Sequence, residues 1–148
     1  MFDEDDVVRL RIALARVSRH LDRQARGDAL TRTQTSVLGT VIRLGPMRIS
    51  ELAEVEGVNP TMLSRIVAKL EDGGLLHRRQ DPADGRAALV EITDEGRAVG
   101  LRLRTERTRL LTERLTSMPG THADDLLAAL PALEALAAAL DPTRPEKT

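Results

Sequence analysis

The segment from Ile49 to Gly96 constrains this chain most, because helix signals and turn signals alternate along it in a definite order. Two short helical stretches flank Glu56–Asn59, where small residues and a glycine let two helices cross closely. Two stretches of strand length follow, Leu75–Gln80 and Ala87–Ile92, separated by residues typical of a turn. A further helix begins at Thr93. This order predicts a winged helix-turn-helix, in a mainly α fold with a small β wing.

The second helix of this segment has two distinct faces. Asn59 followed by Pro60 marks its start, because an Asn side chain accepts hydrogen bonds from free amides and proline suits the first helical position. Apolar residues at helical spacing predict its buried face: Leu63, Ile66, Val67 and Leu70. The residues on the other side are Thr61, Ser64, Arg65, Ala68 and Lys69. This short, polar, cationic face suits a helix in a DNA major groove, although a solvated surface helix shows a similar pattern.

The hairpin that follows resembles the wing of the MarR family of bacterial transcriptional regulators. The similar residues are Asp81-Pro82, Asp84-Gly85-Arg86, and Leu89-Val90 with Thr93 and Gly96, preceded by Leu70-Glu71 and Gly74-Leu75 at the end of the recognition helix. The resemblance covers nearly the whole chain, from a first helix near Asp5 to a last one ending near Leu140. It implies an obligate dimer of winged-helix subunits, in which Arg86 enters the DNA minor groove and Asp84 orients it. A narrow minor groove attracts Arg by its negative potential.

The pattern and the resemblance together predict a DNA-binding transcriptional regulator, acting as a ligand-responsive repressor. Its expected partners are double-stranded DNA with a pseudo-palindromic operator and a second copy of the chain, which would form a homodimer. The residues expected to contact DNA are Asn59, Pro60, Thr61, Met62, Ser64, Arg65, Lys69, Arg79, Asp84 and Arg86. The alternative is a winged-helix module that contacts only protein, since a fold does not fix a function.

Within the DNA-binding lobe, which we take as residues 31–96 and call the winged lobe, three local signals precede the central segment. Thr31 with Gln34 predicts a capping box for a helix that ends near Leu44. Met47–Ile49 is expected to add a short third strand to the wing, and Ser50 to cap the next helix.

Helices for dimerisation are expected on both sides of the winged lobe. In residues 1–30, apolar residues at spacings of three and four predict a helix seam: Val7, Leu10, Leu14, Val17 and Leu21. Residues 97–140 continue a long helix from Thr93 to Met118, then a final helix from His122 to Leu140 that Pro131 should kink. Residues 141–148 are expected to form a flexible polar tail. The alternative to a dimer is a monomeric helical cap, but a small domain offers little surface to bury these stripes.

Composition agrees with a helical protein but shows no global preference for nucleic acid. Of 148 residues, 41% are hydrophobic and Phe2 is the only aromatic residue, which favours helices built from Leu, Val, Ile and Ala. The formal net charge is −1, without the overall basic excess typical of DNA-binding domains. We therefore expect a local positive face, formed by Arg65, Lys69, Arg78, Arg79 and Arg86. Acidic residues in the same region oppose it: Glu71, Asp72, Asp81, Asp84 and Glu91.

Other classes of function find little support. An enzyme needs an acid, base or nucleophile with a perturbed pKa, and Asp81 and Asp84 are predicted to lie at a hairpin tip in water, where nothing perturbs theirs. The three histidines lack metal-ligand spacing and cysteine is absent, so we expect no metal site and no cofactor. No leader or membrane-spanning segment stands out, which predicts a cytoplasmic protein without membrane contact.

The resemblance implies an effector, a small aromatic or amphipathic molecule bound where the first, second and fifth helices meet the winged lobe. The polar candidates for contacting it are Arg16, His20 and Arg43, although charged residues at such positions are mostly solvated surface residues.

Overall fold

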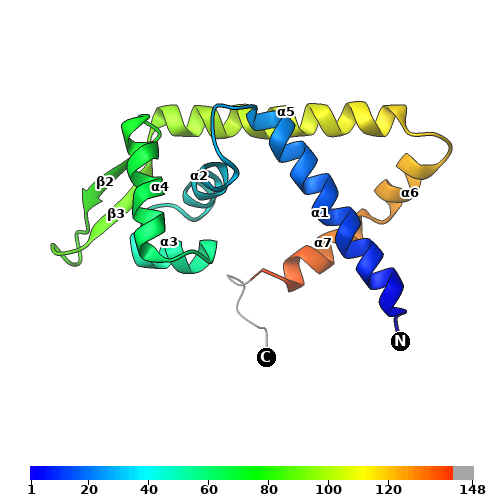
Figure 1. Ribbon diagram of the computed structural model, residues 1–148, viewed down its shortest axis with the longest axis horizontal. Coiled ribbons are helices and arrows are strands. Elements are labelled where there is room, and N and C mark those ends of the chain that lie inside the picture. Colours follow the sequence, from blue (N-terminus) through cyan, green and yellow to red (C-terminus); the bar gives the residue numbers. More distant parts are fainter. Residues whose placement is uncertain (142–148) are drawn as a thin grey trace. The chain divides into compact units, whose positions relative to one another are not determined.

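The computed structural model describes residues 1–141, which contain seven helices and a three-stranded sheet (Figure 1). The elements are α1 (Glu4–Arg26), α2 (Arg32–Leu44), β1 (Met47–Arg48), α3 (Ile49–Glu56), α4 (Pro60–Asp72), β2 (Leu76–Gln80), β3 (Ala88–Ile92), α5 (Asp94–Ser117), α6 (His122–Ala128) and α7 (Leu130–Ala139). Residues 142–148, most of the predicted tail, lie outside the described residues. The chain divides into two compact units, Met1–Leu110 and Leu111–Thr148. The mainly helical winged helix-turn-helix is confirmed.

The sheet has the order β1-β3-β2 and is antiparallel throughout. β3 pairs with β2 from Leu76↔Ile92 to Gln80↔Ala88, and with β1 through Met47↔Val90. The short strand expected at Met47 is therefore present. Because facing residues in antiparallel strands share one side of a sheet, Met47, Leu76 and Val90 lie together on the face toward the core.

The core of the first unit lies between α2, α3, α4, the sheet and the beginning of α5. Its most buried side chains come from α2, α3, α4 and the sheet: Val37, Leu38, Val41, Leu52, Leu63, Val67, Leu70, Leu76 and Val90. α5 adds Val99 and Leu103. Three of the four apolar residues expected inside α4 are buried, and Ile66 is half-buried against the cluster. Packing of this kind sets the rotation of α4 about its axis, and hence which residues it exposes.

Helix starts follow local capping chemistry, with one correction. The capping box of α2 is present: the Gln34 N–H donates to Thr31 Oγ1 (3.1 Å), and the Thr31 N–H donates to Gln34 Oε1 (2.9 Å). The prediction that Ser50 caps α3 is wrong, because β1 leads into the helix without a loop and the cap position falls on Arg48. The Glu51 carboxylate accepts the Arg48 N–H at 3.1 Å instead.

The final helix is divided rather than kinked. α6 ends at Ala128 and α7 begins at Leu130, with Pro131 in its first turn. Proline lacks the N–H that a helix interior needs and its ring collides with the preceding turn, but it fits at a helix start. The position predicted from Pro131 is correct, but one helix ends and another begins there, where only a kink was expected.

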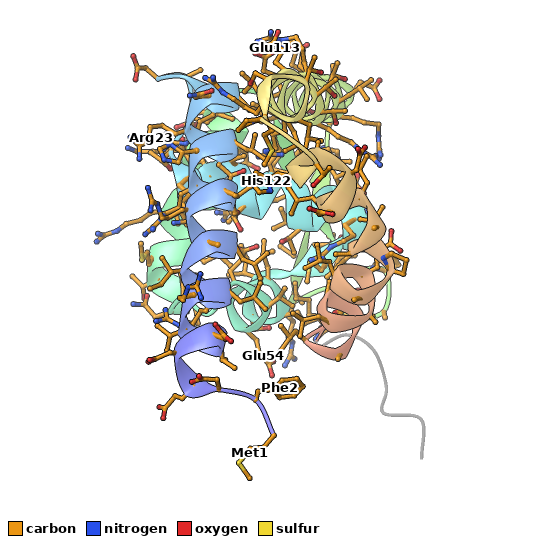
Figure 2. The ribbon with its side chains drawn as sticks, turned by 90° about the vertical axis from the view of Figure 1, so that its right-hand side faces the viewer. Met1, Phe2, Arg23, Glu54, Glu113 and His122 are labelled. Atoms are coloured by element: carbon orange, nitrogen blue, oxygen red, sulfur yellow. The ribbon has the colours of Figure 1, made fainter. Side chains whose placement is uncertain are left out.

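α1 buries little of its surface against the rest of its unit. None of its 23 residues is buried, and Met1 and Phe2 project beyond its start (Figure 2). Near its other end, Arg107 of α5 pairs with Asp22 at 2.8 Å, and Arg26 donates to the Leu30 carbonyl at 3.0 Å. Across residues 1–141, no helix combines the length and the apolar character needed to cross a membrane.

Candidate nucleic-acid interface

A tight turn joins α3 to α4. Gly57 ends α3 in the left-handed conformation (φ 67°), which glycine adopts without the steric cost of a side chain, and the Val58 N–H donates to the Ala53 carbonyl at 3.1 Å. Asn59 then caps α4, because its Oδ1 accepts the Met62 N–H at 2.8 Å, and Pro60 is the first helical residue as predicted. α4 is therefore a well-anchored helix at the edge of the winged lobe.

The outer face of α4 is open to solvent. Thr61, Met62, Arg65 and Lys69 are exposed, and Ser64 is half-buried. The four exposed residues border an open groove of about 530 Å³ whose other wall is the beginning of α2. The groove is lined by Thr31, Gln34, Asn59, Thr61, Met62, Arg65, Ile66 and Lys69. Seven of the ten DNA-contact candidates thus lie on α4 or at its cap. Five of them line the groove, and Pro60 and Ser64 do not.

The wing tip holds Asp84 and Arg86 on the turn between β2 and β3, and in Figure 1 this hairpin projects away from the helices. The Asp84 carboxylate accepts the backbone N–H of Arg86 at 3.1 Å. Gln80 closes the turn by donating from Nε2 to the Gly85 carbonyl at 2.9 Å. Asp84 therefore orders the tip through the backbone, while the Arg86 side chain is exposed. Its expected role in orienting the guanidinium stays a prediction.

Asp81 occupies a different environment from the one expected. It is buried, only 8% exposed, and its Oδ2 accepts from Arg48 Nε (3.0 Å) and Nη2 (2.7 Å), while Oδ1 accepts the Ala83 N–H (2.9 Å). The Ala83 amide and the Arg48 guanidinium hold the pKa of Asp81 below its usual value, and Asp81 in turn raises the pKa of Arg48. The prediction that nothing perturbs the Asp81 pKa is wrong. This ion pair fastens the base of the wing to β1.

The two arginines of β2 point to opposite sides of the sheet. Arg79 lies on the outer side, where its Nε donates to Glu91 Oε2 (2.7 Å), and His77 contacts the other oxygen of the same carboxylate (2.6 Å). These contacts, chiefly the one from Arg79, lower the pKa of Glu91. Arg78 lies on the side of α4: its Nη2 approaches the Ser64 carbonyl (3.4 Å), and its backbone N–H donates to Glu71 (3.0 Å).

Acidic residues near α4 and the wing are largely engaged. Asp81 is paired with Arg48, Glu91 with Arg79 and His77, and Glu71 accepts a backbone N–H. The charges of Asp81 and Glu91 are therefore offset locally, while Glu71, Asp72 and Asp84 keep theirs, and Arg65, Lys69, Arg78 and Arg86 are exposed cations on this side of the lobe. The local positive face expected from the sequence therefore stays a prediction.

The three effector candidates do not gather in one place. Arg16 and His20 lie exposed on α1, and Arg43 lies exposed in the last turn of α2. A separate pocket of about 420 Å³ lies where the end of α1 meets α5, and none of the three lines it; its residues are Ala25, Arg26, Ala29, Leu30, Leu75, Val99, Arg102, Leu103 and Glu106. Within residues 1–141, no three acidic or histidine side chains are grouped as a metal ion would require.

Comparison with known proteins gives concordant matches. Residues 30–88 match the model of the MarR family. An HTH-type transcriptional regulator of Mycobacterium tuberculosis is 32% identical over 127 residues, which span 86% of this chain and 89% of the relative. A transcriptional regulator structure from Pseudomonas aeruginosa superposes with a TM-score of 0.78 at 30% identity, covering 92% of this chain and 98% of the other. The Multiple Antibiotic Resistance Repressor, MarR, shares the fold, with a TM-score of 0.76 at 21% identity over 92% and 96% of the two chains.

Proposed function

Because the chain belongs to the MarR family of transcriptional regulators, we propose that it is a repressor that binds a pseudo-palindromic operator as a homodimer and responds to a small ligand. The observation that supports DNA binding most directly is that α4 has one face buried in the core and an opposite face open to solvent. Leu63, Val67 and Leu70 fill the core, while Thr61, Arg65 and Lys69 border an open groove that no other part of the described chain fills. A regulator of this kind would work in the cytoplasm, beside the chromosome.

We assign α4 to the major groove and the wing tip to the adjacent minor groove. In this arrangement Arg65 contacts a guanine edge, for which a bidentate guanidinium is well suited, and Lys69 contacts a phosphate. Asn59 and Pro60 set the start of the helix. Thr61, Met62 and Ser64 approach base edges. Arg86 enters the minor groove from a wing tip that Asp84 orders. Arg79 contributes least among the proposed contacts, because Glu91 already neutralises it.

A homodimer accounts for the apolar surface of α1. Val7, Leu10, Leu14 and Val17 are 43–51% exposed along one stripe, and Val8 and Ile12 are about as exposed on the other side of the helix. In the second unit, Leu126, Leu127, Leu130, Leu136 and Leu140 are also exposed. A helix with apolar residues on two sides is stabilised when neighbours cover both, as in an intertwined dimer. The two-fold symmetry would set two α4 helices about 34 Å apart, one turn of DNA.

We propose the 420 Å³ pocket of the first unit as the effector site. Leu30, Val99 and Leu103 would contact the apolar body of a small aromatic or amphipathic ligand, and Arg26 and Arg102 would face an acidic group. Arg16, His20 and Arg43 could then take part only through contacts outside this pocket. Such a ligand lowers DNA affinity only by the difference in its affinity for the DNA-competent and misaligned dimers.

Binding of random duplex DNA at two salt concentrations tests this function against the alternative of a protein-binding winged helix. Wild type should bind a labelled duplex in about 50 mM salt and lose a large factor in affinity at about 200 mM, because phosphate contacts release counterions. Lys69→Ala should bind more weakly and with a smaller salt slope, whereas Arg23→Ala, an equal change of charge on exposed α1, should match wild type. Absence of wild-type binding at both concentrations would favour the protein-binding alternative.

A further inference from the structure

Met62 is an unusual residue for the surface it occupies. Its side chain is 47% exposed, and between residues 49 and 92 it is the only large apolar side chain left exposed. Isolated apolar residues on a surface need no special explanation. Met62, however, lies inside the 530 Å³ groove, with the half-buried Ile66 one turn away and the cations Arg65 and Lys69 along the same face.

The packing of α4 prevents Met62 from turning inward. Asn59 holds the Met62 backbone N–H at 2.8 Å, so the first turn is anchored at this residue. The next residue, Leu63, is fully buried in the core, which fixes the rotation of the helix. Met62 is therefore presented to whatever occupies the groove, on a rigid backbone but with a flexible side chain that adapts its shape to a partner.

The occupant that fits this combination is a DNA base pair containing thymine. The major groove presents hydrogen-bond donors and acceptors and a single apolar group, the 5-methyl of thymine. We infer that Met62 reads a thymine by packing against this methyl group, an inference that rests on the proposed placement of α4 in the major groove. Arg65 and Lys69 supply the charge complementarity that brings the duplex to the groove.

The spacing along α4 predicts where this thymine lies. Met62 and Arg65 are three residues apart on the outer face, a rise of roughly 4.5 Å, compared with roughly 3.4 Å between stacked base pairs. The thymine should therefore lie one or two base pairs from the guanine that Arg65 contacts, once in each half-site.

The test is removal of the methyl group from the DNA. An operator is first selected from random duplexes with wild-type protein, and each thymine in it is then replaced singly by deoxyuridine, which differs only by that methyl. Wild type should lose about fourfold in affinity at one thymine per half-site, the effect expected for exposing one buried methyl group. Met62→Ala should bind the thymine operator more weakly but bind the thymine and deoxyuridine versions equally.

Two further variants make the result specific. Met62→Leu should retain the discrimination, and Leu44→Ala, which truncates an exposed apolar side chain of α2 outside the groove, should behave as wild type. Thermal melting checks that each variant is folded. A Met62→Ala variant that still discriminates fourfold, or a wild type indifferent to every deoxyuridine, would overturn the inference while leaving the proposed function intact. Failure of wild type to select any operator would instead refute the proposed function.

Discussion

Replacing Gly96 by Ala should destabilise the protein, although alanine is the better helix former. Gly96 lies buried in the first turn of α5, where the helix crosses the chain that enters β2. A Cβ built there would lie 2.6 Å from Ile92 Cδ1, 2.9 Å from the Leu75 carbonyl carbon, and closer still to the Leu75 carbonyl oxygen. Real Cβ atoms essentially never approach other atoms this closely, so the backbone must move.

The Leu75 peptide has little freedom to move. Its carbonyl accepts the Thr93 N–H at 3.2 Å, and its N–H donates to the Leu70 carbonyl at 2.9 Å. Overpacking a core costs about 1–3 kcal/mol and a lost hydrogen bond about 1 kcal/mol, against a gain in helix propensity of about 1 kcal/mol. The free energy of unfolding should therefore fall by about 1–3 kcal/mol, which lowers Tm by roughly 2–12 °C for a chain of this size.

Two other glycines provide matched controls. At Gly39, within α2, a Cβ would meet no atom within 4 Å, so Gly39→Ala should raise the free energy of unfolding by up to about 1 kcal/mol. At Gly100 the nearest atom is the tip of the Ile42 side chain, which can rotate aside, so Gly100→Ala should lie between the two. Thermal melts at one fixed protein concentration measure all three, because the proposed homodimer would make Tm depend on concentration. A Gly96→Ala protein that melts at or above wild type would refute the reasoning.

Three further predictions concern the dimer, the wing and the base of the wing. Leu14→Asp should place an unpaired charge in the proposed dimer interface and separate or unfold the subunits, as measured by light scattering; a monomeric wild type would contradict the model. Arg86→Ala should weaken operator binding strongly and Asp84→Ala less, with the double variant no worse than Arg86→Ala alone; additive losses in this binding cycle would give Asp84 an independent role. The pKa of Asp81 is lower in the folded state than in the unfolded state, where it is about 4. The stability that Asp81 contributes is therefore fully present above the unfolded-state pKa and is lost as pH falls through the folded-state pKa. Asp81→Asn should therefore be less stable than wild type at pH 7, and the deficit in denaturant melts should shrink in acid; a deficit independent of pH would show that the carboxylate charge is not involved.

Local signals account for the parts of the structure that could be predicted. Asn59-Pro60 and the Thr31–Gln34 box determine helix starts within four residues, and the turn residues between Gln80 and Ala87 require a hairpin, so these elements appear where expected. The spacing of apolar residues likewise identified the buried face of α4. Each of these features depends on residues that are neighbours in sequence.

The features that could not be predicted depend on distant partners or on register. Asp81 is buried because Arg48, 33 residues earlier, reaches it across the sheet. The β2–β3 register decides which face of the sheet Arg78 and Arg79 each occupy, because a slip of one residue would exchange their faces. Arg78, which approaches α4, is one of the cations of the region but not one of the expected DNA contacts, and the alternation of side chains along β2 is the sequence signal that distinguishes it from Arg79.

The Glu71 carboxylate, which accepts the Arg78 N–H, also affects the exposed edge of the sheet. β2 is an outer strand of the sheet, and such a strand offers unpaired N–H groups on which a strand from another molecule can add. Glu71 already takes the N–H of Arg78, and the side chains of β2 beyond Leu76 are exposed and polar. The other outer strand, β1, is only two residues long. Molecules crowded together on neighbouring DNA sites or in a concentrated solution therefore meet sheet edges that resist strand-by-strand growth into aggregates.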